Sequence, residues 1–152
     1  MYYAVVGLFM FALPCLSVVA EVLLAPQPII PLIGKWYVFW AVGVRLLLAG
    51  LRQVIQPRYT AQVILGLKSD ESLLVVRELG FANLAFGLSG LLSIHFPTWC
   101  VPIAIAGGVF YGLAGGNHIL QSHRGKLESV AMVSDIFAAV VLLSFGISVL
   151  AS

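Results

Sequence analysis

Charged side chains are scarce in this sequence. Only 9% of its 152 residues are Asp, Glu, Lys or Arg, whereas 61% are hydrophobic. About a quarter of the residues in a soluble domain are charged, so this composition excludes the soluble globular class and is typical of an integral membrane protein. The formal net charge is only +2, and no run rich in Lys and Arg occurs. A nucleic-acid partner is therefore not expected.

Cysteines and enzyme motifs are also few. Cys15 and Cys100 stand alone in apolar stretches without a C-x-x-C pair, so we interpret both as buried, unreactive thiols. No G-x-G-x-x-G, no P-loop and no serine, histidine and acid spacing typical of a hydrolase is present. The sequence therefore assigns no cofactor and leaves open whether the protein is an enzyme.

Long apolar runs, in contrast, are abundant. About 20 apolar residues cross the roughly 30 Å hydrocarbon core of a bilayer as a helix. Runs of this length cover residues 2–24, 36–55, 77–96, 99–121 and 129–150. The first has no basic segment before it and is longer than the apolar part of a signal peptide, so we interpret it as a span. The prediction is an all-α integral membrane bundle, a single transmembrane domain over residues 1–152 with a four-helix core plus an N-terminal span.

The connections between the runs predict the topology. Three prolines in residues 25–31 cannot sustain a helix and predict a stiff connection. Residues 58–67 are apolar but too short to span, which predicts an interfacial or re-entrant helix that stops at Gly66. The N-terminus shares its side with the connections at 56–76 and 122–128, which carry Arg58, Lys68, Arg124 and Lys126 and lie on the same side as Arg52. The other side has Lys35 alone. The positive-inside rule then places the N-terminus in the cytoplasm and the C-terminus outside.

Small residues form a stripe along each of two spans. Such stripes let helix backbones approach closely. One consists of Ala104, Gly108, Gly112 and Gly116, and the other of Gly80, Asn83, Gly87 and Gly90. Because a short turn joins these spans, we expect the two faces to pack against each other within one chain. The alternative is that the first stripe packs in a homo-oligomer or a larger membrane complex.

Polar side chains lie inside the spans. At about 1.5 Å of rise per residue, six of them fall in the half of the membrane near the N-terminus or at its centre: Arg45, Glu78, Asn83, Asn117, His118 and Asp135. An unpaired charge at the membrane centre is costly, so Arg45 is expected to pair with Glu78 or Asp135. Arg52 extends the basic stripe of the same helix face. Glu21 lies towards the opposite face, and its role stays open.

These six residues admit two interpretations. They would line a pocket that binds a lipid, a quinone or a similar amphipathic small molecule, with Arg45 holding an anionic group and His118 or Glu78 as the acid or base of any reaction. Alternatively, they would form a structural network that satisfies only itself. A transporter or channel is less favoured because no two-half repeat occurs. No metal site is predicted, since no E-x-x-H or H-x-x-x-H places two ligands on one helix face.

Residues 77–87, RELGFANLAFG, resemble an uncharacterised family of small bacterial polytopic membrane proteins. In that family an acidic residue, a glycine and "ANL" open one span and a histidine ends a later one, which here are Glu78, Gly80, residues 82–84 and His118. The family's Gly-His pair before a proline has no counterpart in residues 53–57, which weakens a two-histidine metal site further. The resemblance implies the inner (plasma) membrane of a bacterium, with membrane lipids as partners.

A more distant resemblance links two stretches to the compact four-helix bundles of the DoxX type. These stretches are residues 43–51 and 78–92. DoxX-type bundles are linked to quinone or thiol redox partners. No motif in these stretches is specific enough to transfer an activity.

Overall fold

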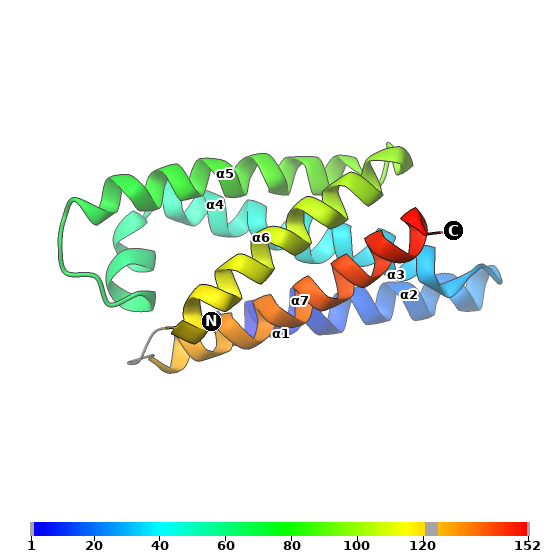
Figure 1. The fold of residues 1–152 in the computed structure, drawn as a ribbon, viewed down its shortest axis with the longest axis horizontal. Coiled ribbons are helices and arrows are strands. Elements are labelled where there is room, and N and C mark those ends of the chain that lie inside the picture. The colour runs from blue at the N-terminus through cyan, green and yellow to red at the C-terminus, as the bar shows by residue number, and fades with distance from the viewer. Residues whose placement is uncertain (1, 121–124, 152) are drawn as a thin grey trace.

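The computed structural model describes residues 2–120 and 125–151. Within these ranges every regular element is a helix, and no strand occurs. Five continuous helical stretches are long and apolar enough to cross a membrane: Tyr2–Leu24, Ile29–Ile55, Ser72–Leu92, Pro97–Leu120 and Lys126–Leu150. The predicted fold class, an all-α bundle with five helices of membrane-spanning character, is confirmed (Figure 1).

Several of these stretches combine different helix types. The first two consist of α1 (Tyr2–Gly7), the π-helix η1 (Leu8–Ala12) and α2 (Leu13–Leu24), followed by α3 (Ile29–Tyr37), the π-helix η2 (Val38–Val44) and α4 (Arg45–Ile55). The remaining elements are the short π-helix η3 (Tyr59–Ile64), α5 (Ser72–Leu92), the 3₁₀ turn η4 (Pro97–Trp99), α6 (Cys100–Leu120) and α7 (Lys126–Leu150).

The second and third spans begin earlier than the sequence pattern suggested. The second starts at Ile29, immediately after Pro28, so Pro31 lies in the first turn of α3. A proline is tolerated there because the missing N–H would have no intrahelical partner anyway. The third starts at Ser72, ahead of the Arg77 and Glu78 charges. The proline-rich connection is therefore shorter than expected.

The short helix η3 lies where the sequence suggested one between the second and third spans. It ends near Gly66, whose φ of 66° is left-handed and favours glycine. The N–H of Leu67 then donates to the carbonyl of Ala61 over 2.8 Å. Figure 1 shows η3 and the start of α5 at the same end of the bundle as the N-terminus. The 25–28 connection, the α5–α6 turn and the C-terminus lie at the other end.

The small-residue face of α5 packs on η2 and α4, not on α6. A Cβ on Gly90 would lie 2.5 Å from the nitrogen of Gly43, and a Cβ on Gly50 would lie 2.8 Å from the carbonyl oxygen of Gly80. These backbones approach so closely because Gly43 and Gly50, one heptad apart, provide a second small face on the preceding span. The expectation that the faces of the third and fourth spans pack together is therefore wrong, although both faces do pack within the chain.

The small-residue stripe of α6 faces α7 along its first half. Ala104 is fully buried, and a Cβ on Gly108 would lie 2.8 Å from Cγ of Leu143. A Cβ on Gly112 would make only an ordinary contact at 3.5 Å, and at Gly116 it would meet no atom within 4 Å. The stripe therefore turns away from α7, and Gly115 takes over the close contact, since a Cβ there would lie 3.2 Å from the backbone nitrogen of Ile136.

Candidate functional site

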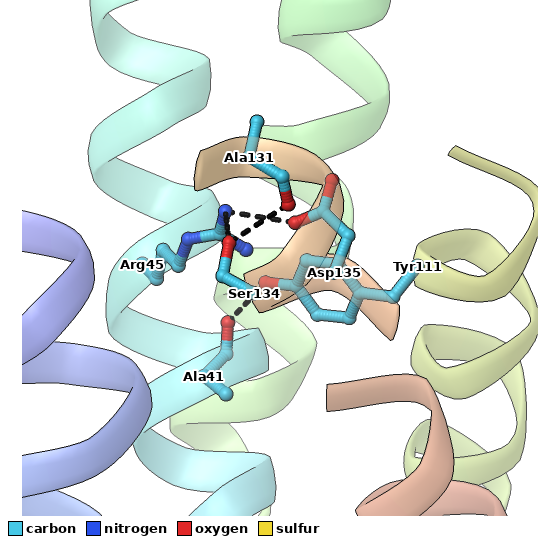
Figure 2. A network of polar contacts seen from close by, with 6 residues as sticks. All are labelled: Ala41, Arg45, Tyr111, Ala131, Ser134 and Asp135. Carbon is cyan, nitrogen blue, oxygen red and sulfur yellow. Dashed lines mark hydrogen bonds and ion pairs between the residues drawn. The ribbon is translucent and has the colours of Figure 1, made fainter. Parts of the chain in front are cut away.

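Arg45 and Asp135 meet in the centre of the bundle. Arg45 is the first residue of α4, and its Nη2 donates to Oδ1 of Asp135 on α7 over 2.9 Å. The same nitrogen lies 3.3 Å from Oγ of Ser134, which in turn donates to the carbonyl of Ala131 (Figure 2). The side chains of Arg45 and Asp135 are only 11% and 10% exposed. Of the two partners expected for Arg45, the structure contains Asp135.

The π-helix η2 leaves the carbonyl of Ala41 available as an acceptor for Tyr111. The N–H of Arg45 bonds to the carbonyls of Trp40 and Val42, so it bypasses the carbonyl of Ala41. The hydroxyl of Tyr111 on α6 donates to that carbonyl (Figure 2). The Tyr111 ring also lies 5.0 Å from Cζ of Arg45, a cation–π distance. A buried tyrosine thereby fixes both the irregular helix and the guanidinium beside it, and π-helical turns of this kind are frequent at functional sites.

A cavity of about 400 Å³ lies beside this network. Residues from α1, α4, η3, α5, α6 and α7 line it, and most of the wall is apolar. Four of the six predicted site residues contribute to the wall: Arg45, Asn83, His118 and Asp135. The volume is within the range of small-molecule sites, which combine apolar walls with a few converging polar groups.

Two buried polar atoms of the wall residues lack partners. Nδ2 of Asn83 donates to Oε1 of Gln53 over 2.7 Å. Oδ1 of Asn83 and Nη1 of Arg45 are buried without a hydrogen-bond partner among the described residues. An unsatisfied buried group costs about 1–3 kcal/mol. Neighbouring atoms shield both atoms from the cavity, so they lie behind its surface and not on it.

His118 and Glu128 connect the end of α6 to the start of α7. Nδ1 of His118 lies 3.0 Å from Oε1 of Glu128, and the two side chains are 12% and 5% exposed. His118 is part of the cavity wall, with Glu128 behind it. This pair therefore links α6 to α7 at this part of the wall.

Glu78 and Asn117 do not belong to the cavity, which corrects the predicted set. Both are exposed on the outer faces of their helices. On α5 the buried positions are Val76, Gly80 and Asn83, and a helix turns about 100° per residue, so position 78 points away from that face. On α6 the same argument applies to Asn117, two residues after the buried Gly115. The sequence analysis considered how deep these residues lie along their helices, but not which helix face they occupy.

Glu21 belongs to a separate cluster at the opposite end. Its carboxylate accepts hydrogen bonds from Nζ of Lys35 over 2.8 Å and from Nε1 of Trp36 over 2.7 Å. This cluster joins α2 to α3, and the cavity wall does not include it. Glu21 therefore has a structural partner on the neighbouring helix.

Neither cysteine is fully buried, contrary to the sequence interpretation. Cys15 is exposed and Cys100 is half-buried, and both are free thiols. Cys15 lies on α2, which has many exposed apolar side chains, as expected for a helix that faces lipid. Among the described residues, no group of three or more His, Cys, Asp and Glu side chains is placed to hold a metal ion.

Sequence analysis missed several residues of the site. Tyr111 lies within an apolar run, where a buried hydroxyl needs a partner and is therefore a usable signal. Gln53 and Glu128 were assigned to the end of a span and to a connection, whereas both are buried. Ser134 was not considered, although it directly precedes Asp135 and contacts Arg45. Gln53 and Glu128 lie in the last turn of α4 and the first turn of α7, and only the packing of these turns shows that they are buried.

Comparison with known proteins identifies a family. No curated protein and no solved structure matches the chain. One family matches residues 4–151, almost the whole length. The prediction of an uncharacterised family is thus confirmed, and the chain belongs to the family of unknown function DUF6790.

Proposed function

We propose that this membrane protein binds an amphipathic small molecule, a lipid or a quinone, in the cavity beside Arg45. The observation that carries the proposal is a largely apolar cavity of about 400 Å³ whose wall also contains the polar residues Arg45, Asn83, His118 and Asp135. An apolar wall accommodates a hydrocarbon tail, and the polar cluster accommodates a headgroup.

Binding is favoured over catalysis at this site. Glu78, one of the two residues considered as an acid or base, is exposed and outside the cavity. The other, His118, is already bound to Glu128. Asp135 is held by Arg45. These partners orient the polar side chains, as a preformed binding site requires.

We further propose that the protein resides in the inner membrane of a bacterium, with its N-terminus in the cytoplasm. Among the described residues, Lys35 on α3 is the one Lys or Arg near the end of the bundle that holds the 25–28 connection and the C-terminus. The connection between α4 and α5, with Arg58 and Lys68, and the start of α7, with Lys126, lie at the other end (Figure 1). This asymmetry follows the positive-inside rule. The cavity would then open in the cytoplasmic half of the membrane.

A second proposal is a structural role in a homo-oligomer or a larger membrane complex. One observation supports this role: Gly116 has open space beside it, and its neighbours Leu113 and Leu120 are exposed. However, Ala104 and Gly108 already pack within the chain. Less of the stripe is therefore available to a partner than the sequence suggested.

Native mass spectrometry of the full chain released in detergent tests both proposals. We expect a monomer with a defined small molecule, retained by Glu78→Gln and lost from the double variant Arg45→Met, Asp135→Leu. The double variant removes the polar site without leaving an unpaired charge. A ligand-free oligomer that Gly112→Ile disrupts would favour the assembly role instead, and a ligand-free monomer would contradict both.

A further inference from the structure

A second arginine of the cavity wall, Arg52, lies closer to the end of the bundle than Arg45. The two are seven residues apart on the same face of α4, which separates their backbones by about 10 Å along the helix. Because α4 ends at Ile55, Arg52 is within the last turn. It therefore lies near the level where lipid headgroups meet the hydrocarbon core.

The charge of Arg52 has no carboxylate partner in the described part of the chain. Arg45 pairs with Asp135 at 2.9 Å and Lys35 with Glu21 at 2.8 Å, but no described carboxylate lies within 4.0 Å of Arg52. Asp135, the carboxylate of the described cavity wall, is already bound to Arg45. The wall thus carries an uncompensated positive charge at this level.

The guanidinium of Arg52 is held with its hydrogen-bonding edge available. Its Cζ lies 3.5 Å from the ring centroid of Tyr59 on η3. Stacking occupies the face of a guanidinium, while its five N–H donors point outward in the plane. The next two residues of η3, Thr60 and Ala61, are buried, which fixes the ring. This fixed position lowers the entropy that a ligand must overcome.

We propose that the cavity binds the oxyanion of an anionic lipid at Arg52. This inference rests on the proposed function and specifies its ligand. A guanidinium binds phosphate and carboxylate through two parallel hydrogen bonds, so either an anionic phospholipid or a fatty acid provides the required chemistry. The apolar side chains of Leu48, Leu79 and Phe110 in the same wall would contact the hydrocarbon chain.

Both sources carry an oxyanion and a hydrocarbon chain, so the wall described above suits either. The experiment below separates the two.

The test uses the full chain purified in an uncharged detergent and analysed by native mass spectrometry. Equal amounts of phosphatidylglycerol, phosphatidylcholine and oleate serve as probes. Because a hydrogen bond to a charged group contributes about 1.5–3 kcal/mol, we expect an anionic lipid to be retained at least about tenfold over phosphatidylcholine. Arg52→Gln should abolish this preference, and Arg52→Lys, which keeps the charge but not the fork, should keep part of it.

Arg58→Gln is the matched control. Arg58 lies six residues further on, is 72% exposed and does not line the cavity, so this variant should keep the full preference. Unchanged helix content and gel-filtration elution show that each variant is folded. Retention of phosphatidylglycerol above oleate identifies a phospholipid, and the reverse identifies a fatty acid.

The outcomes distinguish this inference from the proposed function. Equal retention of phosphatidylglycerol and phosphatidylcholine by the wild-type protein, or equal losses in Arg52→Gln and Arg58→Gln, would overturn the anionic-lipid inference while the cavity still binds a ligand. If the wild-type protein retains no probe and no co-purified small molecule, the proposed function itself fails.

Discussion

Arg45 and Asp135 lie 90 positions apart in the chain and join α4 to α7 through an ion pair of 2.9 Å. The pair lies in the cavity wall and has the hydroxyl of Ser134 beside it. Desolvating two charges is expensive, so such a pair is weak evidence for a gain in stability. The position of the pair in the cavity wall instead suggests that it holds the Arg45 side chain in a fixed orientation. We therefore propose that the pair serves ligand binding.

Removing one charge of the Arg45–Asp135 pair should lower the free energy of unfolding much more than removing both charges. We expect Asp135→Ala to lower the free energy of unfolding by about 3 kcal/mol, because it leaves the buried guanidinium unpaired. The double variant Arg45→Met, Asp135→Leu should lose much less. Unfolding of detergent-solubilised protein, followed by far-UV circular dichroism, measures both changes.

The exposed Glu78 provides the control for this ion pair. Glu78→Ala should change stability by no more than about 0.5 kcal/mol, as surface substitutions usually do. If Asp135→Ala were equally mild, the ion pair would not form in the membrane-embedded protein.

Tyr111→Phe tests the hydrogen bond that the hydroxyl of Tyr111 donates to the π-helix η2. The variant keeps the buried ring but removes the donor to the carbonyl of Ala41, and this carbonyl is the one that the N–H of Arg45 bypasses. We expect a loss of about 1 kcal/mol in the free energy of unfolding. Tyr3→Phe is the control, because Tyr3 is 51% exposed. Equal stability of the two variants would show that the hydroxyl of Tyr111 is not needed to hold η2.

The sequence predicted the spans better than the helix faces. Apolar length alone indicated five spanning helices, and Arg45, Asn83, His118 and Asp135 of the predicted site residues line one cavity. Glu78 and Asn117, predicted with them, point outward. The rotation of a helix is set by its packing partners, and the partner of α5 was misidentified because Gly43 and Gly50 were not considered as a small face.

Two further features depended on tertiary structure. The pairing of Asn83 with Gln53 requires α4 and α5 to be in contact, since the two residues lie 30 positions apart. The place of Tyr59 over Arg52 depends on the left-handed Gly66 and on the fold of η3. Neither contact follows from a periodic pattern, because each depends on how separate elements pack against each other.

Gly90→Ala should destabilise the bundle, whereas Gly116→Ala should not. A Cβ at position 90 would lie 2.5 Å from the backbone nitrogen of Gly43 in η2, so the span that contains η2 and α4 would have to move away from α5. At position 116 a Cβ meets nothing within 4 Å, and alanine is favoured over glycine in a helix by about 1 kcal/mol. Thermal unfolding monitored by circular dichroism should give a lower midpoint for the first variant and an equal or higher one for the second. Equal midpoints would contradict the close approach of this span and α5.

The orientation in the membrane can be tested with single cysteines. In a background where Cys15 and Cys100 are replaced by alanine, Ser69→Cys marks the connection before α5 and Thr98→Cys marks the α5–α6 turn. Both positions are exposed, and the two connections lie at opposite ends of the bundle. Because the end near Ser69 carries more Lys and Arg, we expect a membrane-impermeant maleimide to label only Thr98→Cys in intact cells and both variants after permeabilisation.

The labelling result also decides which leaflet supplies the ligand. Ser69 follows η3, which forms part of the cavity wall through Tyr59 and Thr60. If Ser69→Cys is protected in intact cells, the cavity opens in the cytoplasmic leaflet, and an anionic lipid at Arg52 would come from there. If Ser69→Cys is labelled in intact cells instead, the orientation is reversed. The charge asymmetry would then violate the positive-inside rule, and the ligand would be drawn from the outer leaflet.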